Sequence, residues 1–299
     1  MSGSSGLIGS AVARFLASGG HRVSRLVRRL EALGEADIPW DPAEGRLEAD
    51  PLEGLDAVVH LAGESIAAGR WTRARKAGIR ESRIRGTRLL SEALARLDNP
   101  PRVLLCASAV GFYGDRKDEE VDESAAPGRG FLSEVCQEWE AATEPAARRG
   151  IRVVVLRFGV VLSAAGGALP RMLTPFRLGL GGRVGTGRQW MSWVALADAV
   201  EAIHFALVQG ALAGALNVVA PSPVTNRELA RVLGRVLRRP AFLPVPAVAL
   251  RLALGEMGEE LLLSGQRVVP RRLLDAGFTF RHPDLEEALR FELGIPRAV

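Results

Sequence analysis

Several residue types that carry common chemistry are scarce in this chain of 299 residues. It has one tyrosine, two cysteines (Cys106 and Cys136) and two lysines (Lys76 and Lys117). Two cysteines fit a reducing compartment, and neither they nor the four scattered histidines have the spacing of metal ligands. We therefore expect no metal site.

Long apolar runs are missing too. The chain has no stretch of about 18 apolar residues and no signal-peptide pattern, which predicts a soluble, cytoplasmic protein with no membrane partner. Its net charge of +5 comes from arginine. Because the arginines are spread through predicted helices and loops, we expect no nucleic-acid partner. An anionic small molecule is the simpler ligand for such a chain.

The first nine residues contain a glycine-rich turn. Gly3, Gly6 and Gly9 recur at three-residue spacing and open a helical apolar pattern over residues 11–16. Glycine permits a sharp turn and a close approach of the backbone to a pyrophosphate. The helix N-terminus adds free N–H groups and a partial positive charge. The motif therefore predicts a phosphate-binding turn at the start of a dinucleotide-binding fold.

The strand that should lead into this turn is nearly absent. Only Met1 and Ser2 precede Gly3, where about five strand residues are expected. We predict that the start lies further upstream or that the central strand is truncated. The alternative is a flexible expression scar, but Leu7 and Ile8 continue the motif without a break.

Predicted strands and helices alternate beyond the turn. Strands are expected over residues 21–27, 37–40, 55–62, 101–108 and 151–157, and helices over 73–97 and 132–149. The alternation predicts an α/β fold of the Rossmann type, with a doubly wound parallel sheet over residues 1–162. Residues 163–299 are predicted to form a smaller, mostly helical C-terminal lobe that is interleaved with this domain and selects the substrate.

The end of the second predicted strand indicates which dinucleotide binds. In NAD-preferring proteins an acidic residue at this point binds the ribose 2′-hydroxyl. Here Val27 is followed by Arg28 and Arg29, whose guanidinium groups can bind a 2′-phosphate that an acid would repel. The sequence thus favours NADP(H) over NAD(H). The alternative is that both arginines are solvated loop residues.

Four motifs together carry a family resemblance. They occupy residues 3–9, 58–63 (VVHLAG), 108–114 (SAVGFYG) and 156–160 (LRFGV). With them the chain resembles the extended short-chain dehydrogenases/reductases, and more narrowly their atypical branch described as nucleoside-diphosphate-sugar epimerase-like. The narrower resemblance rests on residues 40–42, 63–66, 70–71, 82–83, 139–140, 175–182, 217–221 and 265–270.

The resemblance implies a dinucleotide site. Arg28 is expected to meet the 2′-phosphate, Asp41 the adenine amine, and the Val160 backbone the nicotinamide amide. Arg83 stands where the superfamily has an asparagine, and either reaches a cofactor or substrate anion or forms a buried ion pair. The full implied cofactor-binding set is Gly3, Ser5, Gly6, Leu7, Ile8, Gly9, Arg28, Arg29, Asp41, Leu61, Ala62, Gly63, Arg83 and Val160.

The usual catalytic pair of this superfamily is missing. Its reductases and epimerases use a tyrosine and a lysine one helical turn apart. Alignment on residues 139–140 places Leu132 and Cys136 at these positions, and neither can replace them. Tyr113 and Lys117 match the Tyr-x-x-x-Lys pattern, but their context predicts a loop, where this spacing does not place them together.

Ser108 and Tyr113 are the remaining catalytic candidates. The Ser108 hydroxyl, at the carboxyl end of a strand, can hydrogen-bond a substrate carbonyl, or else it caps the strand end. Tyr113 can donate a proton on its own. Glu64, Arg70, Trp71, Gln189 and Trp190 are further pocket candidates, each with packing as its alternative role.

These observations support two main functions, besides a sugar-nucleotide-binding protein with no redox step. The first is an NADP(H)-binding oxidoreductase or epimerase that acts on a small molecule with an unusual proton donor. The alternative is a catalytically inactive NADPH-binding sensor or scaffold protein, because both members of the usual pair are missing. By analogy with relatives, the two long predicted helices can form a homodimer interface.

Overall fold

The computed structural model describes residues 1–28, 34 and 36–296. Its main sheet contains four parallel strands in the order β11 (Gly214–Val218), β7 (Arg152–Phe158), β5 (Val103–Ala109) and β4 (Ala57–His60). Ser2 bridges β4 to β1 (Leu26–Val27), which pairs with β2 (Ile38–Asp41), and β3 (Arg46–Leu47) adds an antiparallel edge. The chain thus starts in the middle of the sheet and builds outward to both sides, so the predicted doubly wound sheet is confirmed.

The central strand consists of little more than Ser2. Its N–H donates to the Val59 carbonyl at 3.0 Å, and its own carbonyl accepts from the Leu61 N–H at 3.4 Å. The neighbouring strand is short as well. Residues 21–25 were predicted to belong to it, but only Leu26 and Val27 pair as a strand. Met1 lies beside this segment, and its amino group donates to the Ser24 carbonyl.

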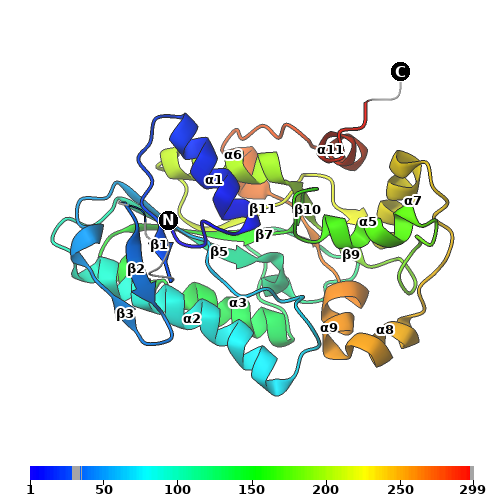
Figure 1. Cartoon of the computed structure of the whole chain (residues 1–299), viewed down its shortest axis with the longest axis horizontal. Coiled ribbons are helices and arrows are strands. Elements are labelled where there is room, and N and C mark those ends of the chain that lie inside the picture. Colours follow the sequence, from blue (N-terminus) through cyan, green and yellow to red (C-terminus); the bar gives the residue numbers. More distant parts are fainter. Residues whose placement is uncertain (29–33, 35, 297–299) are drawn as a thin grey trace.

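Helices cover both faces of the sheet (Figure 1). One face carries α1 (Leu7–Ser18) and α6 (Leu196–Val208), and the other carries α2 (Arg73–Arg96), α3 (Phe131–Ala141) and α4 (Glu144–Arg148). The single helix predicted over residues 132–149 is therefore two helices. Pro145 has no N–H to donate to the carbonyl of Ala141, so the first helix ends and a new one starts.

The second lobe has its own apolar core. Trp193, Leu173 and Leu233 are among its buried residues. The lobe contains α5 (Leu169–Arg177), α7 (Asn226–Leu237), α8 (Ala247–Leu254), α9 (Glu256–Gly258), η4 (Glu259–Leu263) and α11 (Leu285–Glu292). Four short strands, β8 (Val160–Leu162), β10 (Trp193–Ala195), β9 (Trp190–Met191) and β12 (Val224–Thr225), pair two by two.

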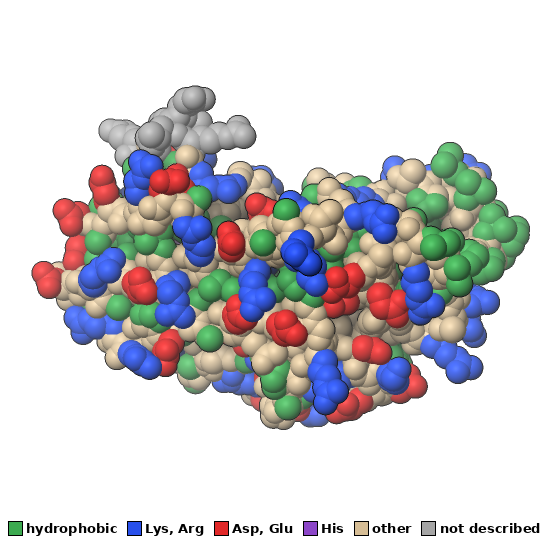
Figure 2. All heavy atoms as spheres, turned by 90° about the horizontal axis from the view of Figure 1, so that it is seen from below, with side chains coloured by type: hydrophobic (Ala, Val, Ile, Leu, Met, Phe, Trp, Pro, Cys, Tyr) green, Lys and Arg blue, Asp and Glu red, His purple; other side chains and the backbone are tan. Residues whose placement is uncertain are grey.

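The chain passes between the two units more than once. After residue 162, α6 and β11 return to the main sheet, and α10 (Arg271–Asp275) packs against β11. The domain boundary at residues 162 and 163 stays a prediction. Figure 2 shows hydrophobic side chains gathered at the far end of the second lobe. No helix in the described ranges has the length and apolar character needed to span a bilayer.

Candidate functional site

The glycine-rich turn lies against the carboxyl end of β4. Gly3 has a φ of +67°, and a Cβ atom there would lie 2.6 Å from the Leu61 carbonyl carbon. A Cβ atom on Gly9 would lie 2.1 Å from the Gly3 carbonyl oxygen. The structure therefore packs the turn, the residues after β4 and the start of α1 together with no room for a side chain at either position.

The amino end of α1 is open to a ligand. The helix begins at Leu7 with Gly6 as its N-cap, and no described side chain caps it. The Gly6 N–H bonds the Gly3 carbonyl at 3.0 Å, and the backbone N–H groups that follow start the helix. These unpaired N–H groups and the helix dipole create a local positive potential that suits a pyrophosphate.

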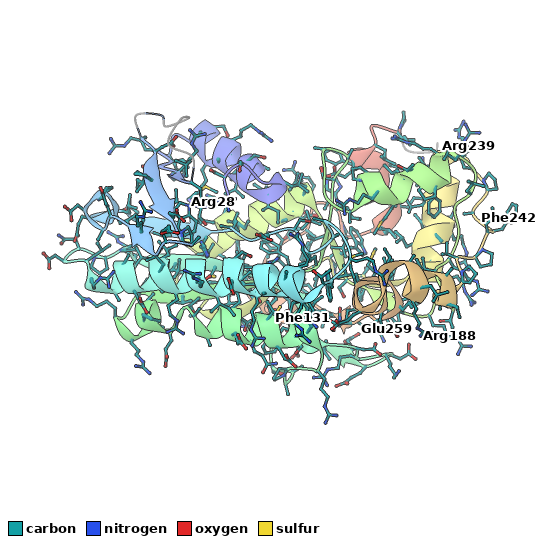
Figure 3. The ribbon with its side chains drawn as sticks, turned by 60° about the horizontal axis from the view of Figure 1, so that its bottom comes forward. Arg28, Phe131, Arg188, Arg239, Phe242 and Glu259 are labelled. Atoms are coloured by element: carbon teal, nitrogen blue, oxygen red, sulfur yellow. The ribbon has the colours of Figure 1, made fainter. Side chains whose placement is uncertain are left out.

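The residues expected at the adenosine end lie in two turns. Arg28 is exposed just after β1, and Figure 3 shows it in the other lobe from Arg239 and Phe242. Arg29 lies outside the described residues. Asp41 ends β2, and its carboxylate accepts the backbone N–H groups of Ala43 and Glu44 at 3.0 and 3.2 Å. Asp41 thus stabilises a local turn, and its contact with adenine stays a prediction.

Arg83 of α2 lies beside the residues that follow β4. Its guanidinium donates to the carbonyls of Ile79 and Glu64, both at 3.0 Å, and stacks over the Trp139 ring. A Cβ atom on Gly63 would lie 3.4 Å from the Arg83 Cζ atom. These hydrogen bonds go to carbonyls, so Arg83 does not form the buried ion pair considered above as its alternative role. Burial lowers the pKa of Arg83.

The positions of the missing tyrosine and lysine lie on α3. A Cβ atom on Gly111 would lie 3.3 Å from the Leu132 Cβ and 3.9 Å from the Cys136 Sγ, so both side chains face this turn. Burial raises the pKa of Cys136 to about 11, while the nearby Arg83 charge acts in the opposite direction. Cys136 is therefore a neutral thiol, and the cation beside it comes from α2.

Tyr113 and Lys117 are not on one helix. Tyr113 ends the short turn η3 (Val110–Tyr113), and Lys117 has a φ of +50° and an exposed side chain that pairs with Asp115. The loop context predicted for this pair is confirmed. The two residues therefore do not form a tyrosine–lysine pair of the usual geometry.

Ser108 and Tyr113 instead belong to one buried polar network. Ser108 donates to the Glu140 carboxylate at 2.7 Å, and Glu140 forms two hydrogen bonds with Arg157 at 2.8 and 2.9 Å. Arg157 donates to the Tyr113 hydroxyl at 3.0 Å, which donates to Asn217 at 2.7 Å. The network spans β5, α3, β7 and β11. Both catalytic candidates thus have their hydroxyls engaged in hydrogen bonds.

Sequence reasoning missed three members of this network. Glu140, Arg157 and Asn217 stand in motifs that carry the family resemblance, but no role was predicted for them. The available signal was a charged or polar residue inside an otherwise apolar strand, as Arg157 in β7 and Asn217 in β11. Tyr113 is fully buried, and burial raises its pKa. Ser108 is buried as well, at 3% exposure, so burial alone does not rank the two hydroxyls as proton donors.

A second buried chain of hydrogen bonds starts beside the glycine-rich turn. Ser2 Oγ and His60 Nδ1 are 2.6 Å apart, and His60 Nε2 and the Thr87 hydroxyl are 3.0 Å apart. Trp139 Nε1 donates to the same hydroxyl at 2.8 Å. Burial lowers the pKa of His60 from 6.5 to about 4, so the imidazole is neutral at pH 7.

This shift predicts an acid-sensitive fold. The unfolded chain binds a proton at His60 below its ordinary pKa of 6.5, whereas the folded chain does so only near pH 4. The stability contributed by neutral His60 is therefore complete above pH 6.5 and is lost as the pH falls from 6.5 towards 4. We expect a loss of about 1 kcal/mol between about pH 7.5 and 5.5, measured by urea unfolding. His60→Gln should remove this component, and an unchanged pH slope in that variant would contradict the assignment.

Each of the other pocket candidates contacts another part of the chain. Glu64 pairs with Arg75, Trp71 packs edge-on against Phe131, and Arg70 lies near Gly255. The Gln189 amide bonds two carbonyls, and Trp190 donates to Asp118 at 2.8 Å. A cavity of about 610 Å³ lies in the second lobe, lined by arginines and away from the glycine-rich turn.

Together, the sheet order, the glycine-rich turn and the open end of α1 define a Rossmann-type nucleotide-binding protein. The chain belongs to the NAD-dependent epimerase/dehydratase family, whose model matches residues 1–219. This confirms the resemblance drawn from the motifs. Residues 245–292 match a second model, a domain of unknown function, DUF1731.

Similar proteins cover nearly the whole chain. The epimerase family protein Mb2239 of Mycobacterium bovis is 48% identical over 97% of this chain and 96% of its own. YfhF of Bacillus subtilis is 38% identical over 97% and 95%. The crystal structure of human SDR39U1 with NADPH superposes with a TM-score of 0.89, 36% identity and 98% coverage of both chains.

Proposed function

We propose that this protein is an NADP(H)-dependent oxidoreductase or epimerase that acts on a small molecule without the usual tyrosine–lysine pair. The observation that supports this most directly is the glycine-rich turn, which packs against Leu61 and leads into α1, whose N-terminus is capped by no side chain of the described residues. NADPH supplies a hydride when it is bound. The human relative SDR39U1, crystallised with NADPH, supports the same cofactor.

The residues present fit this cofactor. The N–H groups at the start of α1 suit the pyrophosphate, and Arg28 lies where β1 ends with no acid in its place. Leu61 and Gly63 follow β4 beside the turn, where the backbone can line the adenosine. Arg83 supplies a positive charge near Cys136, the position at which the superfamily has its lysine.

Ser108 is the group that we propose for proton transfer. Its hydroxyl donates a hydrogen bond to the Glu140 carboxylate, which accepts two hydrogen bonds from Arg157. Ser108 can therefore take a proton from a substrate hydroxyl and release its own to Glu140, and the reverse transfer protonates an alkoxide. Tyr113 supports this arrangement through its hydrogen bond with Arg157.

The cofactor preference is tested by Arg28→Glu. We expect NADPH binding to weaken about thirtyfold while NADH binding changes less than about threefold, because a carboxylate repels only the 2′-phosphate form. Calorimetric titration of both dinucleotides measures the two affinities. Arg22→Glu is the matched control, since it makes the same charge change at an exposed position shortly before β1. Equal losses for NADPH and NADH in Arg28→Glu would contradict the 2′-phosphate contact.

Leu132 and Cys136 favour one alternative, an NADPH-binding sensor without catalysis. Leu132 has no proton to transfer, and burial raises the pKa of the Cys136 thiol to about 11, so this side chain is neutral at pH 7. The two functions differ in Ser108→Ala. A sensor should keep its NADPH affinity and its partners in this variant, and wild-type protein should oxidise no NADPH with any carbonyl substrate. An enzyme should show turnover in the wild type that Ser108→Ala abolishes.

A further inference from the structure

Large apolar side chains are exposed together at the end of the second lobe. This apolar tip comprises Leu178, Leu180, Phe242, Leu243, Val248 and Leu252. Its segments are neighbours, because the Leu243 N–H donates to the Gly181 carbonyl at 3.2 Å and the Val245 N–H to the Arg183 carbonyl at 2.9 Å. The hydrophobic cluster at this end is visible in Figure 2. The exposed groups therefore come from two neighbouring parts of the chain, residues 178–180 and 242–252.

Helix α8 gives the strongest indication that this surface is a binding surface. Seven of its eight residues are apolar, yet none is buried. Val248 and Leu252 are exposed by 63% and 74%, and their four-residue spacing places them on one face with Ala249 and Ala253. A helix that is apolar nearly all round is normally enclosed in a core or in lipid. Water alone is a poor environment for this face.

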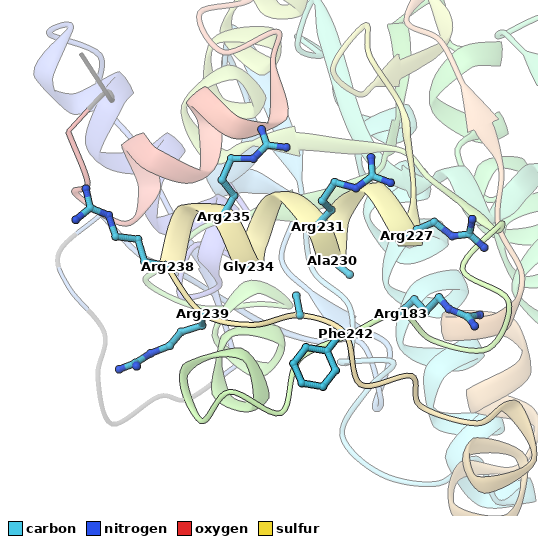
Figure 4. A pocket seen from close by; sticks show the side chains of 10 residues that line it. Arg183, Arg227, Ala230, Arg231, Gly234, Arg235, Arg238, Arg239 and Phe242 are labelled. Atoms are coloured by element: carbon cyan, nitrogen blue, oxygen red, sulfur yellow. The ribbon is translucent and has the colours of Figure 1, made fainter.

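Arginines flank the apolar tip. The cavity of about 610 Å³ beside it is lined by Phe242 and by Arg183, Arg227, Arg231, Arg235, Arg238 and Arg239. Figure 4 shows Arg227, Arg231 and Arg235 projecting from one side of α7, with Phe242 on the neighbouring segment. Within the described residues, only Arg235 of this set has an acidic partner, Glu286. Arg231 and Arg235 also line a neighbouring cavity together with Glu228, Asp284 and Glu286. The positive charge beside the exposed hydrocarbon is therefore mainly that of Arg183, Arg227, Arg238 and Arg239.

We propose that the apolar tip docks on an anionic lipid surface. Its apolar side chains enter the boundary between headgroups and acyl chains, while the flanking guanidiniums meet lipid phosphates. A lipid surface fits better than an acidic protein, because protein interfaces favour tyrosine, tryptophan and methionine, whereas this tip is aliphatic with one phenylalanine. The expectation of no membrane partner rested on missing long apolar runs, which concern spanning helices and not a surface built from separate segments.

The test is co-sedimentation of the full chain with two kinds of vesicle. One is pure phosphatidylcholine, and in the other about a third of the lipid is phosphatidylglycerol, which gives an anionic surface. We expect binding to the anionic vesicles only, weakened when salt rises from about 0.1 to 0.5 M. Leu252→Asp and Phe242→Asp should each lower the partition coefficient at least about tenfold, and so should the double change Arg238→Glu and Arg239→Glu.

Two control variants separate this surface from general effects. Val208→Asp alters an apolar side chain that is 66% exposed elsewhere. Arg14→Glu combined with Arg22→Glu makes the same double charge reversal at two other exposed positions. Both should bind vesicles like the wild type, and NADPH titration should show that the tip variants remain folded. Absence of binding to anionic vesicles would overturn the proposal. So would a dimer, seen by light scattering, that Leu252→Asp separates, because the tip would then join two copies of the chain.

Discussion

Replacing Gly9 with alanine is expected to destabilise the protein by about 2 kcal/mol and to weaken NADPH binding more than tenfold. The direction of the stability change is informative, because Gly→Ala inside a helix usually stabilises the helix by about 1 kcal/mol. Here the new Cβ would lie 2.1 Å from the Gly3 carbonyl oxygen, a backbone atom that cannot rotate away. Gly3 in turn is held against Leu61, so the whole turn has to shift.

The matched control is Gly19→Ala at the other end of α1. Gly19 has a φ of −81°, and a Cβ atom there would meet nothing closer than 3.4 Å. Its effect should stay within about 0.5 kcal/mol, with NADPH binding unchanged. Urea unfolding and calorimetric titration measure both quantities. If Gly9→Ala were as stable as the wild type and bound NADPH normally, the glycine-rich turn would not be the binding site of the cofactor's pyrophosphate.

The second large effect concerns the ion pair between Glu140 and Arg157. Only 6% of the Arg157 side chain and 15% of the Glu140 side chain are exposed. Burial alone would lower the pKa of Arg157, but the hydrogen bonds and charge of Glu140 raise it above its ordinary value. Glu140→Leu leaves the guanidinium buried without its partner, which should cost about 3–5 kcal/mol of unfolding free energy.

A double variant shows whether the charge itself is the cause. Glu140→Leu combined with Arg157→Met removes both charges, so its loss should be well below the sum of the two single losses. The exposed pair Arg148–Glu144, whose side chains are 75% and 54% exposed, is the matched control. Glu144→Leu should cost less than about 1 kcal/mol. Similar losses for Glu140→Leu and Glu144→Leu in urea unfolding would refute a buried, coupled pair.

The sequence predicted those parts of the protein that depend on local preferences. Gly3, Gly6 and Gly9 indicated the phosphate-binding turn, because glycine accepts the positive φ found at Gly3 and the close backbone contacts found at Gly3 and Gly9 without strain. The alternating strands and helices predicted a parallel doubly wound sheet, since such segments are joined by crossover helices. The loop around Tyr113 followed from its flanking glycines. In each case, residues close together in the chain carried the information.

Only the tertiary structure decided which distant residues meet. Glu140 reaches Ser108 and Arg157 from another helix, and Asn217 reaches Tyr113 across 104 positions of the chain. The apolar tip likewise combines residues 178–180 with 242–252, which no local pattern connects. The physical reason is that side-chain type and periodicity set the local backbone, whereas the packing of helices on the sheet sets the distances between separated segments. The sequence by itself therefore determined the family and the cofactor turn, and the packed fold determined the polar network and the exposed tip.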